Sequence, residues 1–235
     1  MFKRLIIPML LLINLMATGQ EKVFHDANAQ KRQAENFQSI KVGDGIDLYI
    51  MQGTEEGVVV SATEIAHRDK MRTVVENGEL KIYLEKGWNW HNKKLTAYVA
   101  VKTLNKLRAS GGSDIIIQGE LKTDKLNLVL TGGSDFKGQI AVTDLTINQS
   151  GGSDVHVKGN AVNVKVDANG GSDFTGYDLT AEYAIIQVSG GSDASITVTK
   201  EMAAEASGGS DVNYKGNPVM KYKSASGGGS VTKRG

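Results

Sequence analysis

A four-residue motif that recurs through the second half of the chain constrains its fold more than any other feature. Gly-Gly-Ser-Asp occurs six times, and the spacing between its successive aspartates changes by only a few positions from copy to copy. An altered copy follows at Ser226–Val231, where Ser230 stands in the place of the aspartate. Identical motifs at a nearly constant period predict stacked repeats. The six aspartates are Asp114, Asp135, Asp154, Asp173, Asp193 and Asp211.

Between the motifs, apolar and polar residues alternate, as in Leu126–Leu130 and Val162–Val166. This alternation predicts short strands with one apolar face. Stacking the units about 4.8 Å apart would bury those faces in one continuous core. A propeller blade would need about 40 residues, twice the observed period. We therefore predict an all-β fold, a right-handed parallel β-helix or β-solenoid with coils of about 19 residues, the handedness following from the general crossover rule.

The motif itself has the composition of a turn. Its glycines indicate a positive φ or a close approach to the next coil, and its aspartate can accept a hydrogen bond from an N–H two residues on, as in an Asx turn. Stacked carboxylates about 4.8 Å apart repel by roughly 1 kcal/mol in water. We therefore expect the aspartate column to be solvent-exposed, bonded to backbone N–H groups, or bridged by cations. A structural turn ladder and a calcium-binding ladder are the two alternatives.

Many units carry a further glycine a few residues after the motif, which predicts a second corner in the coil. Each coil would then consist of two or three short strands joined by sharp turns. These additional glycines are Gly119, Gly138, Gly159, Gly176 and Gly216.

The first half of the chain also predicts strands, without the repeated motif. Asn77-Gly78 predicts a hairpin turn, and residues 65–72 predict a short helical turn. We expect residues 37–108 to form a β-rich portion packed on the same stack as the repeats at 109–235, behind a loose lead-in at 20–36. The candidate strands are Ile46–Ile50, Val58–Val60, Leu80–Leu84 and Leu95–Val101.

Residues 1–19 are typical of a secretory signal peptide. Lys3 and Arg4 precede the apolar run Leu5–Met16, and Ala17 and Gly19 are spaced like the small residues of a cleavage site. The run is shorter than the roughly 20 apolar residues that span a bilayer. We therefore expect an exported protein, periplasmic, cell-surface or secreted, with no membrane span once the signal is removed.

The composition argues against nucleic-acid binding and against catalysis. A formal net charge of +1 provides no basic stripe for nucleic acid. Catalytic clefts on β-helices combine carboxylates with Arg, Lys, His or Tyr, whereas residues 109–230 contain no Arg and the single histidine His156, a solvated side chain by its place on the polar face. The four histidines lack metal-ligand spacing. We predict no enzyme, no catalytic residues, no cofactor and no metal site, calcium at the aspartate column being the alternative.

Both tryptophans of the chain lie in the polar segment Gly87–Lys94. Exposed aromatic rings can stack on sugars or anchor a protein partner, so Trp88 and Trp90 are candidate ligand contacts. Alternatively, they fold back as a cap over the open end of the stack, which every repeat protein must cover.

Several segments, in order along the chain, resemble those of a known family. They are Phe37–Val42, Gly45–Leu48, Val58–Ala62 and Asn77–Ile82, followed by the Ser-Gly-Gly-Ser-Asp turns. In these segments the chain resembles the putative auto-transporter adhesin, head GIN domain family of bacterial envelope proteins, over nearly the whole mature chain. The family more often shows Gly-Ser-Gly-Asp in its turns. The resemblance implies a β-helical fold and an export signal, and the family name suggests adhesion.

Three functions compete on these observations. The first is a non-catalytic, adhesin-like interaction module of the cell envelope, or a secreted one, which displays a rigid solenoid surface to an envelope protein or a glycan. The second is a calcium-stabilised structural scaffold, whose thermal stability calcium would raise. The third, least favoured by the residues present, is a polysaccharide-active β-helix enzyme.

Overall fold

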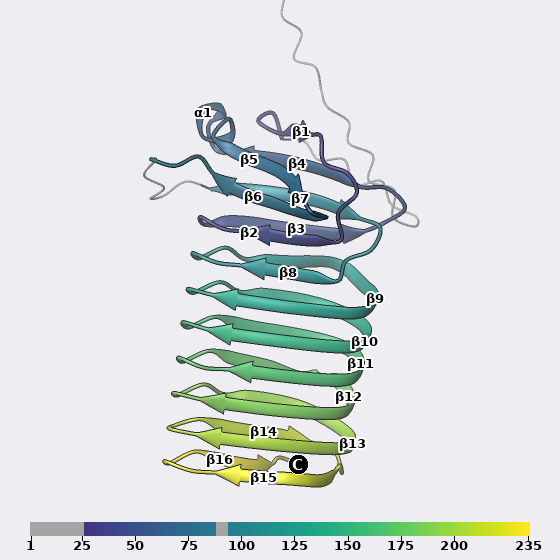
Figure 1. Cartoon of the computed structure of the whole chain (residues 1–235), viewed down its shortest axis with the longest axis vertical. Coiled ribbons are helices and arrows are strands. Elements are labelled where there is room, and N and C mark those ends of the chain that lie inside the picture. Colours follow the sequence, from purple (N-terminus) through teal and green to yellow (C-terminus); the bar gives the residue numbers. More distant parts are fainter. Residues whose placement is uncertain (1–25, 88–93) are drawn as a thin grey trace, which may run out of the picture.

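The repeated half of the chain is a flattened solenoid in which each coil lies directly on the next (Figure 1). The computed structural model describes residues 26–87 and 94–235, so the predicted signal peptide lies outside the described residues. About seven turns of about 19 residues form the stack. The predicted all-β solenoid is confirmed, while its right-handed sense stays a prediction from the crossover rule.

Each repeat strand runs from one glycine turn to the next and bends midway, which gives every coil a first and a second arm. The parallel register aligns equivalent positions, so that Leu126 lies beside Leu145 and Leu145 beside Val164. Because buried and surface residues alternate along each strand, the aligned apolar positions form one continuous core. These strands are β9 (Ile115–Thr131), β10 (Phe136–Ser150), β11 (Asp154–Ala168), β12 (Asp173–Ser189) and β13 (Ala194–Ser207).

Shorter strands make up the C-terminal coil. They are β14 (Asp211–Lys215), β15 (Val219–Ala225) and β16 (Ser230–Lys233). Both β14 and β15 pair with β13, and β16 pairs with β14. The other edge of β15 pairs with no strand among the described residues.

The N-terminal half continues the same stack. It supplies β2 (Ser39–Val42), β3 (Ile46–Gln52) and β8 (Lys106–Ala109). Both β3 and β8 pair in parallel with β9, and β2 pairs with β8. The expected packing of the first half on the repeats is therefore confirmed.

Antiparallel pairs complete the N-terminal end of the stack. The strands are β4 (Gly57–Ala62), β5 (Met71–Glu76), β6 (Glu79–Leu84) and β7 (Leu95–Val101). While β7 pairs in parallel with β3, β4 runs antiparallel to β7 and β5 antiparallel to β6. Asn77 and Gly78, with φ values of 52° and 74°, join β5 to β6, which confirms the predicted hairpin turn.

The lead-in is partly ordered, contrary to expectation. Its residues Gln30–Arg32 form β1, which pairs antiparallel with β4, because backbone groups can complete a ladder whatever their side chains. The helical turn α1 spans Ile65–Arg68 and is shorter than expected, since β5 begins at Met71. Within the described residues, no helix is long and apolar enough to cross a membrane.

In three successive coils, the inward side chains of the first arms alternate in size. Phe136 and Phe174 are almost fully buried, and each is followed two residues later by an inward-facing glycine, Gly138 or Gly176. A Cβ added at Gly176 would lie 2.7 Å from Cζ of Phe174. The ring thus occupies the space that a side chain would otherwise fill, and the coil between the two phenylalanines carries valines at the matching positions.

This arrangement corrects the prediction that all five additional glycines mark corners. Gly138 and Gly176 are buried strand residues. At the corner opposite the motif, Gly159 and Gly216 have φ values of 115° and 92°. A Cβ there would lie 2.0 to 2.1 Å from a carbonyl oxygen of the neighbouring coil, whereas Gly119 has a φ of 84° and open space around it.

Candidate functional site

The repeated motif forms a corner that stacks closely along the whole solenoid. Both of its glycines usually have positive φ values, for example 73° at Gly151 and 74° at Gly152. A Cβ added at Gly151 would lie 3.1 Å from the backbone nitrogen of Gly132 in the preceding coil, and at Gly152 it would meet only a carbonyl oxygen at 3.9 Å. Glycine is therefore required at the first position both by the left-handed backbone conformation and by the close approach of the preceding coil. At the second position it is required by the conformation alone.

The serine of the motif is fully buried in every copy, a role that the sequence reasoning did not assign. Its hydroxyl accepts a hydrogen bond from the serine N–H of the preceding coil: Ser172 N–H bonds Ser192 Oγ at 3.0 Å, and Ser192 N–H bonds Ser210 Oγ at 3.1 Å. These bonds satisfy buried backbone donors. The buried serines are Ser113, Ser134, Ser153, Ser172, Ser192 and Ser210.

The aspartate carboxylates also bond between coils. Oδ1 of Asp135 accepts from Asp154 N–H at 3.1 Å, and Oδ1 of Asp193 accepts from Asp211 N–H at 2.9 Å. Sequence reasoning expected acceptance from an N–H two residues on, whereas these donors belong to the next coil. The last carboxylate of the column, Asp211, accepts from the hydroxyl of Ser230 at 2.7 Å.

The aspartate column is longer than the motif indicates. The register pairs Leu48 with Ile115, which places Asp47 beside Asp114. Ile46 N–H donates to the hydroxyl of Ser113 at 3.0 Å, as a motif serine would. The sequence signal was a glycine two residues before an aspartate that opens an alternating strand, but isoleucine replaces the serine and the pattern was missed.

Crowding affects the carboxylates at the N-terminal end of this column. Burial raises the pKa of Asp114, and the negative charges of Asp135 and Asp47 raise it further. A hydrogen bond from the Asp135 N–H lowers this pKa and offsets part of the increase. Burial also raises the pKa of Asp47, while Lys94 lowers it. In residues 26–87 and 94–235, no three His, Cys, Asp or Glu side chains are grouped so as to hold a metal ion.

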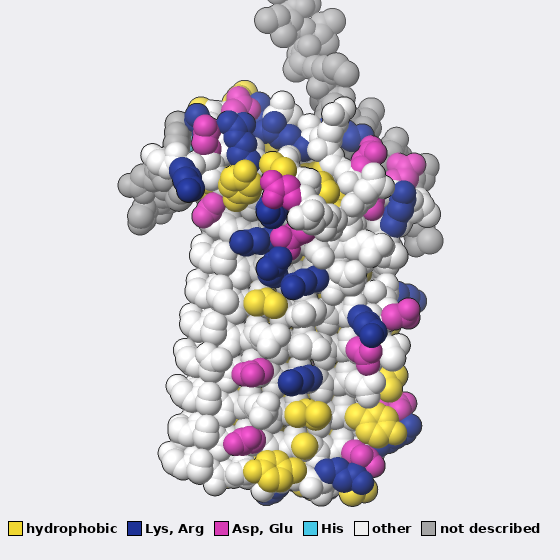
Figure 2. Space-filling view, in the orientation of Figure 1, with side chains coloured by type: hydrophobic (Ala, Val, Ile, Leu, Met, Phe, Trp, Pro, Cys, Tyr) yellow, Lys and Arg dark blue, Asp and Glu magenta, His cyan; other side chains and the backbone are white. Residues whose placement is uncertain are grey.

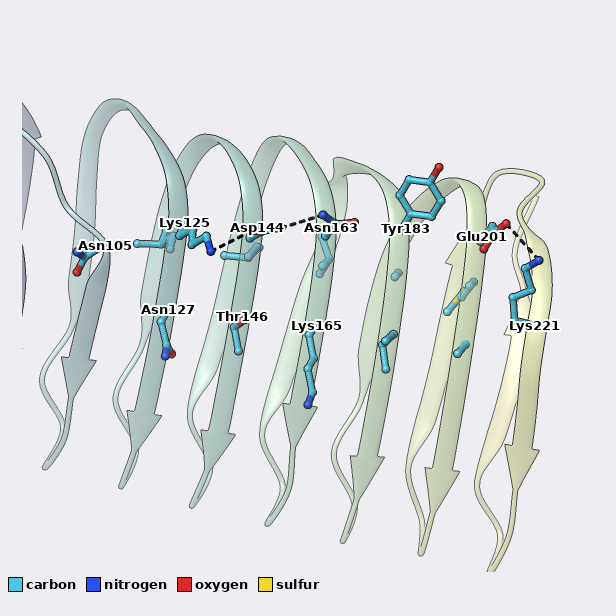
Figure 3. A pocket seen from close by; sticks show the side chains of 17 residues that line it. Asn105, Lys125, Asn127, Asp144, Thr146, Asn163, Lys165, Tyr183, Glu201 and Lys221 are labelled. Carbon is cyan, nitrogen blue, oxygen red and sulfur yellow. Dashed lines mark hydrogen bonds and ion pairs between the residues drawn. The ribbon is translucent and has the colours of Figure 1, made fainter.

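The second arms of the coils carry a long hollow, which we call the axial groove. It has a volume of about 710 Å³ and runs along the stack between two columns of outward side chains (Figure 3). One wall is Asn105, Lys125, Asp144, Asn163, Tyr183, Glu201 and Lys221. The other is Asn127, Thr146, Lys165, Ile185 and Ala203.

Polar contacts order the first wall along the stack. Asn163 Nδ2 donates to Asp144 Oδ1 at 2.8 Å, and Lys221 Nζ lies 3.2 Å from Glu201 Oε1. On the other wall, Oδ1 of Asn127 is a buried acceptor without a hydrogen-bond partner among the described residues. Tyr183 and Ile185 are 37% and 50% exposed. The groove thus offers hydrogen-bonding groups and an apolar surface side by side.

The candidate ligand contacts Trp88 and Trp90 lie outside the described residues. His156 is exposed on a first arm, away from the axial groove. The face drawn in Figure 2 shows basic, acidic and hydrophobic side chains interspersed along the stack.

Residues 36–218 match the family described as putative auto-transporter adhesin, head GIN domain. The chain belongs to this head GIN family. The match confirms the resemblance noted in the sequence, and it ends one residue before β15 begins.

Solved structures share the fold of this head GIN chain. A putative adhesin from Bacteroides fragilis is 22% identical with a TM-score of 0.81, over 88% of this chain and 96% of that one. A putative adhesin from Parabacteroides merdae is 18% identical with a TM-score of 0.72, over 88% and 95%. A putative lipid binding protein from Parabacteroides distasonis is 19% identical with a TM-score of 0.69, over 88% and 96%. At these identities the likeness shows the head GIN fold alone, and no curated protein matches the chain.

Proposed function

We propose that this protein is a non-catalytic, exported, adhesin-like module that holds an extended glycan along the axial groove. The observation that carries the proposal is the continuity of the groove, whose two walls are built from equivalent positions of successive coils. A groove that crosses many strands at right angles fits a chain-like ligand better than a compact one.

The chemistry of the walls suits a sugar chain. Asn127, Thr146 and Asn163 offer amide and hydroxyl groups, which both donate and accept hydrogen bonds as sugar hydroxyls do. Neighbouring coils repeat these groups at the strand spacing of about 4.8 Å. Tyr183 adds an exposed aromatic ring, and such rings pack on the apolar faces of sugars.

Export and adhesion are supported by the predicted signal peptide and by the names of the relatives. The family description and two of the three solved neighbours carry the word adhesin, and none of the three is described as an enzyme. A glycan of the envelope or of a target surface would meet the groove in any of the expected compartments.

The proposal is tested by binding of a panel of envelope and host oligosaccharides, screened on an array and measured by calorimetry. Tyr183→Ala and Asn163→Ala should weaken binding of a hit at least tenfold, or about 1.4 kcal/mol. Thr175→Ala and His156→Ala alter exposed positions on the first arms of the same coils and should leave binding unchanged. Unaltered melting temperatures would show that all four variants fold.

Two results would overturn the proposal. One is the absence of any glycan hit, or a hit whose affinity the groove variants do not change. The other is shortening of the bound glycan during prolonged incubation, which would make the groove an active site.

A further inference from the structure

The C-terminal coil carries a local excess of positive charge. Residues 212–235 contain five cations and neither Asp nor Glu, whereas the whole chain has a net charge of only +1. All five side chains are exposed. They are Lys215, Lys221, Lys223, Lys233 and Arg234.

Most of this charge is not balanced by carboxylates. Among the salt bridges of the described residues, only Lys221 of this group takes part, with Glu201 at 3.2 Å. Lys233 Nζ donates to Asn217 Oδ1 at 2.6 Å and Arg234 Nε to Asn213 Oδ1 at 2.7 Å. Neutral partners such as these fix a cation in place without cancelling its charge.

Apolar side chains are exposed within the same coil. Val219 is 60% exposed and Tyr222 is 55% exposed. Tyr222 aligns with Ala203 in the preceding coil, and Ala203 aligns with Ile185 in the coil before that. Ile185 is itself half exposed. Hydrophobic side chains accordingly gather at this end of the face drawn in Figure 2. We call Val219, Tyr222, Lys215, Lys223, Lys233 and Arg234 the terminal patch.

Protection of the open strand edge explains only part of this patch. Lys223 aligns with the buried Ala204, so a lysine stands where the other coils place a core residue. Lysines at a free edge discourage pairing with another sheet. That role requires no exposed valine or tyrosine, and large apolar side chains beside an open edge would favour association. The combination of cations with exposed apolar groups needs a partner that is both anionic and apolar.

We propose that the terminal patch docks the C-terminal coil against a lipid bilayer that carries anionic headgroups. Cations near such a surface are attracted by its negative potential, and tyrosine favours the interface between headgroups and acyl chains. Lysine stems can lie along apolar surface while their ammonium groups reach the phosphates. Val219 and Tyr222 pair with Glu201 and Ala203 of the groove walls, so the terminal patch adjoins the last coils of the axial groove, whereas Asn127, Thr146 and Asn163 lie in more distant coils.

Co-sedimentation of the exported protein with vesicles tests the proposal. Binding to phosphatidylcholine vesicles that contain phosphatidylglycerol should exceed binding to pure phosphatidylcholine at least tenfold, and should fall as salt is added. Lys223→Glu/Lys233→Glu should lower the partition coefficient at least tenfold. The control Lys137→Glu/Lys158→Glu reverses the same charge at exposed first-arm positions and should have little effect.

A second variant keeps the test decisive if the charge reversal disturbs folding. Val219→Ser/Tyr222→Ser preserves every charge and should still weaken binding several-fold, with an unchanged melting temperature. Tyr183→Ala should not alter vesicle binding, which separates this proposal from that of the groove. Three results would each reject a lipid surface as the partner. The first two are an equal loss of binding in the control variant and equal binding to neutral vesicles. The third is equally tight binding to soluble dextran sulfate that Val219→Ser/Tyr222→Ser does not weaken.

Discussion

The two corners of each coil place different demands on the same backbone. At the motif corner, the same glycines and the same serine bonds recur from coil to coil. At the opposite corner the pairing shifts register, for example between His156 and Gly159, and its glycines differ between coils. Yet the closest approach at any described glycine lies here, where a Cβ at Gly159 would sit 2.0 Å from the carbonyl oxygen of Ile140.

The comparison shows that repetition in a sequence marks the constraints that all coils share, and not the strongest ones. The motif corner imposes a moderate constraint many times. The small variation in the length of the repeat is accommodated at the opposite corner. There, single residues such as Gly159 have no space for a side chain. A residue that matters greatly can therefore stand outside any visible pattern.

The largest effect is expected at this non-repeating corner. Gly159→Ala would drive a methyl group into the backbone of the neighbouring coil at a φ of 115°, and we expect a loss of more than about 4 kcal/mol or failure to fold. Gly119→Ala, at a φ of 84° with open space, should lose only about 1–2 kcal/mol. Urea unfolding of both variants checks the difference, and equal losses would refute the contrast.

Within the motif corner, the first glycine should matter more than the second. Both substitutions place alanine at a positive φ, but the Cβ of Gly151→Ala would also lie 3.1 Å from the backbone nitrogen of Gly132. The Cβ of Gly152→Ala would meet no atom closer than 3.9 Å. We expect losses of about 2–3 and about 1 kcal/mol respectively. If thermal unfolding shows the reverse order, close stacking is not the reason for the first glycine.

The smallest effect is expected from the charge of a motif aspartate. The pKa of Asp114 is raised above 3.8 in the folded chain, so between 3.8 and the raised value the folded state binds more protons and stability falls as pH rises. Asp114→Asn keeps the acceptor oxygen and removes the charge. It should stabilise the chain at pH 7 by about 1 kcal/mol or less, since the group is partly solvated.

Melting temperatures measured from pH 7 down to pH 3 check this expectation. The advantage of Asp114→Asn should shrink as pH falls through the raised pKa, because the wild-type carboxyl then becomes neutral as well. Asp178→Asn changes an exposed aspartate outside the column and should bring no such gain. A gain that is constant over the whole pH range would contradict charge crowding as its cause.

The sequence predicted the solenoid because its regular part depends on local features. Glycine pairs, alternating strands and Asn77-Gly78 each dictate a backbone conformation within a few residues. The pairing of β1 was missed because Gln30–Arg32 carries no apolar signal, and its ladder depends on backbone groups alone. Asp47 was missed because its turn has the conformation of the motif without its serine.

The axial groove could not be predicted from any single segment. Its lining residues come from positions such as Asp144, Asn163 and Tyr183, which are separated by a whole coil along the chain and adjoin only through the register. In the sequence they are ordinary surface residues of amphipathic strands. The pairing shifts register at the corner opposite the motif, for example between Gly176 and Thr180. A simple count along the repeat therefore does not find the lining residues.

The single valine layer between the two phenylalanine–glycine layers has a consequence for how this stack can change length. Removing residues 154–172 would leave the motif intact, yet it would bring the layers of Phe136 and Phe174 into direct succession, with no valine layer between the two rings. Loss of this one coil would therefore disturb the packing of the two rings, although the motif would still repeat once per coil.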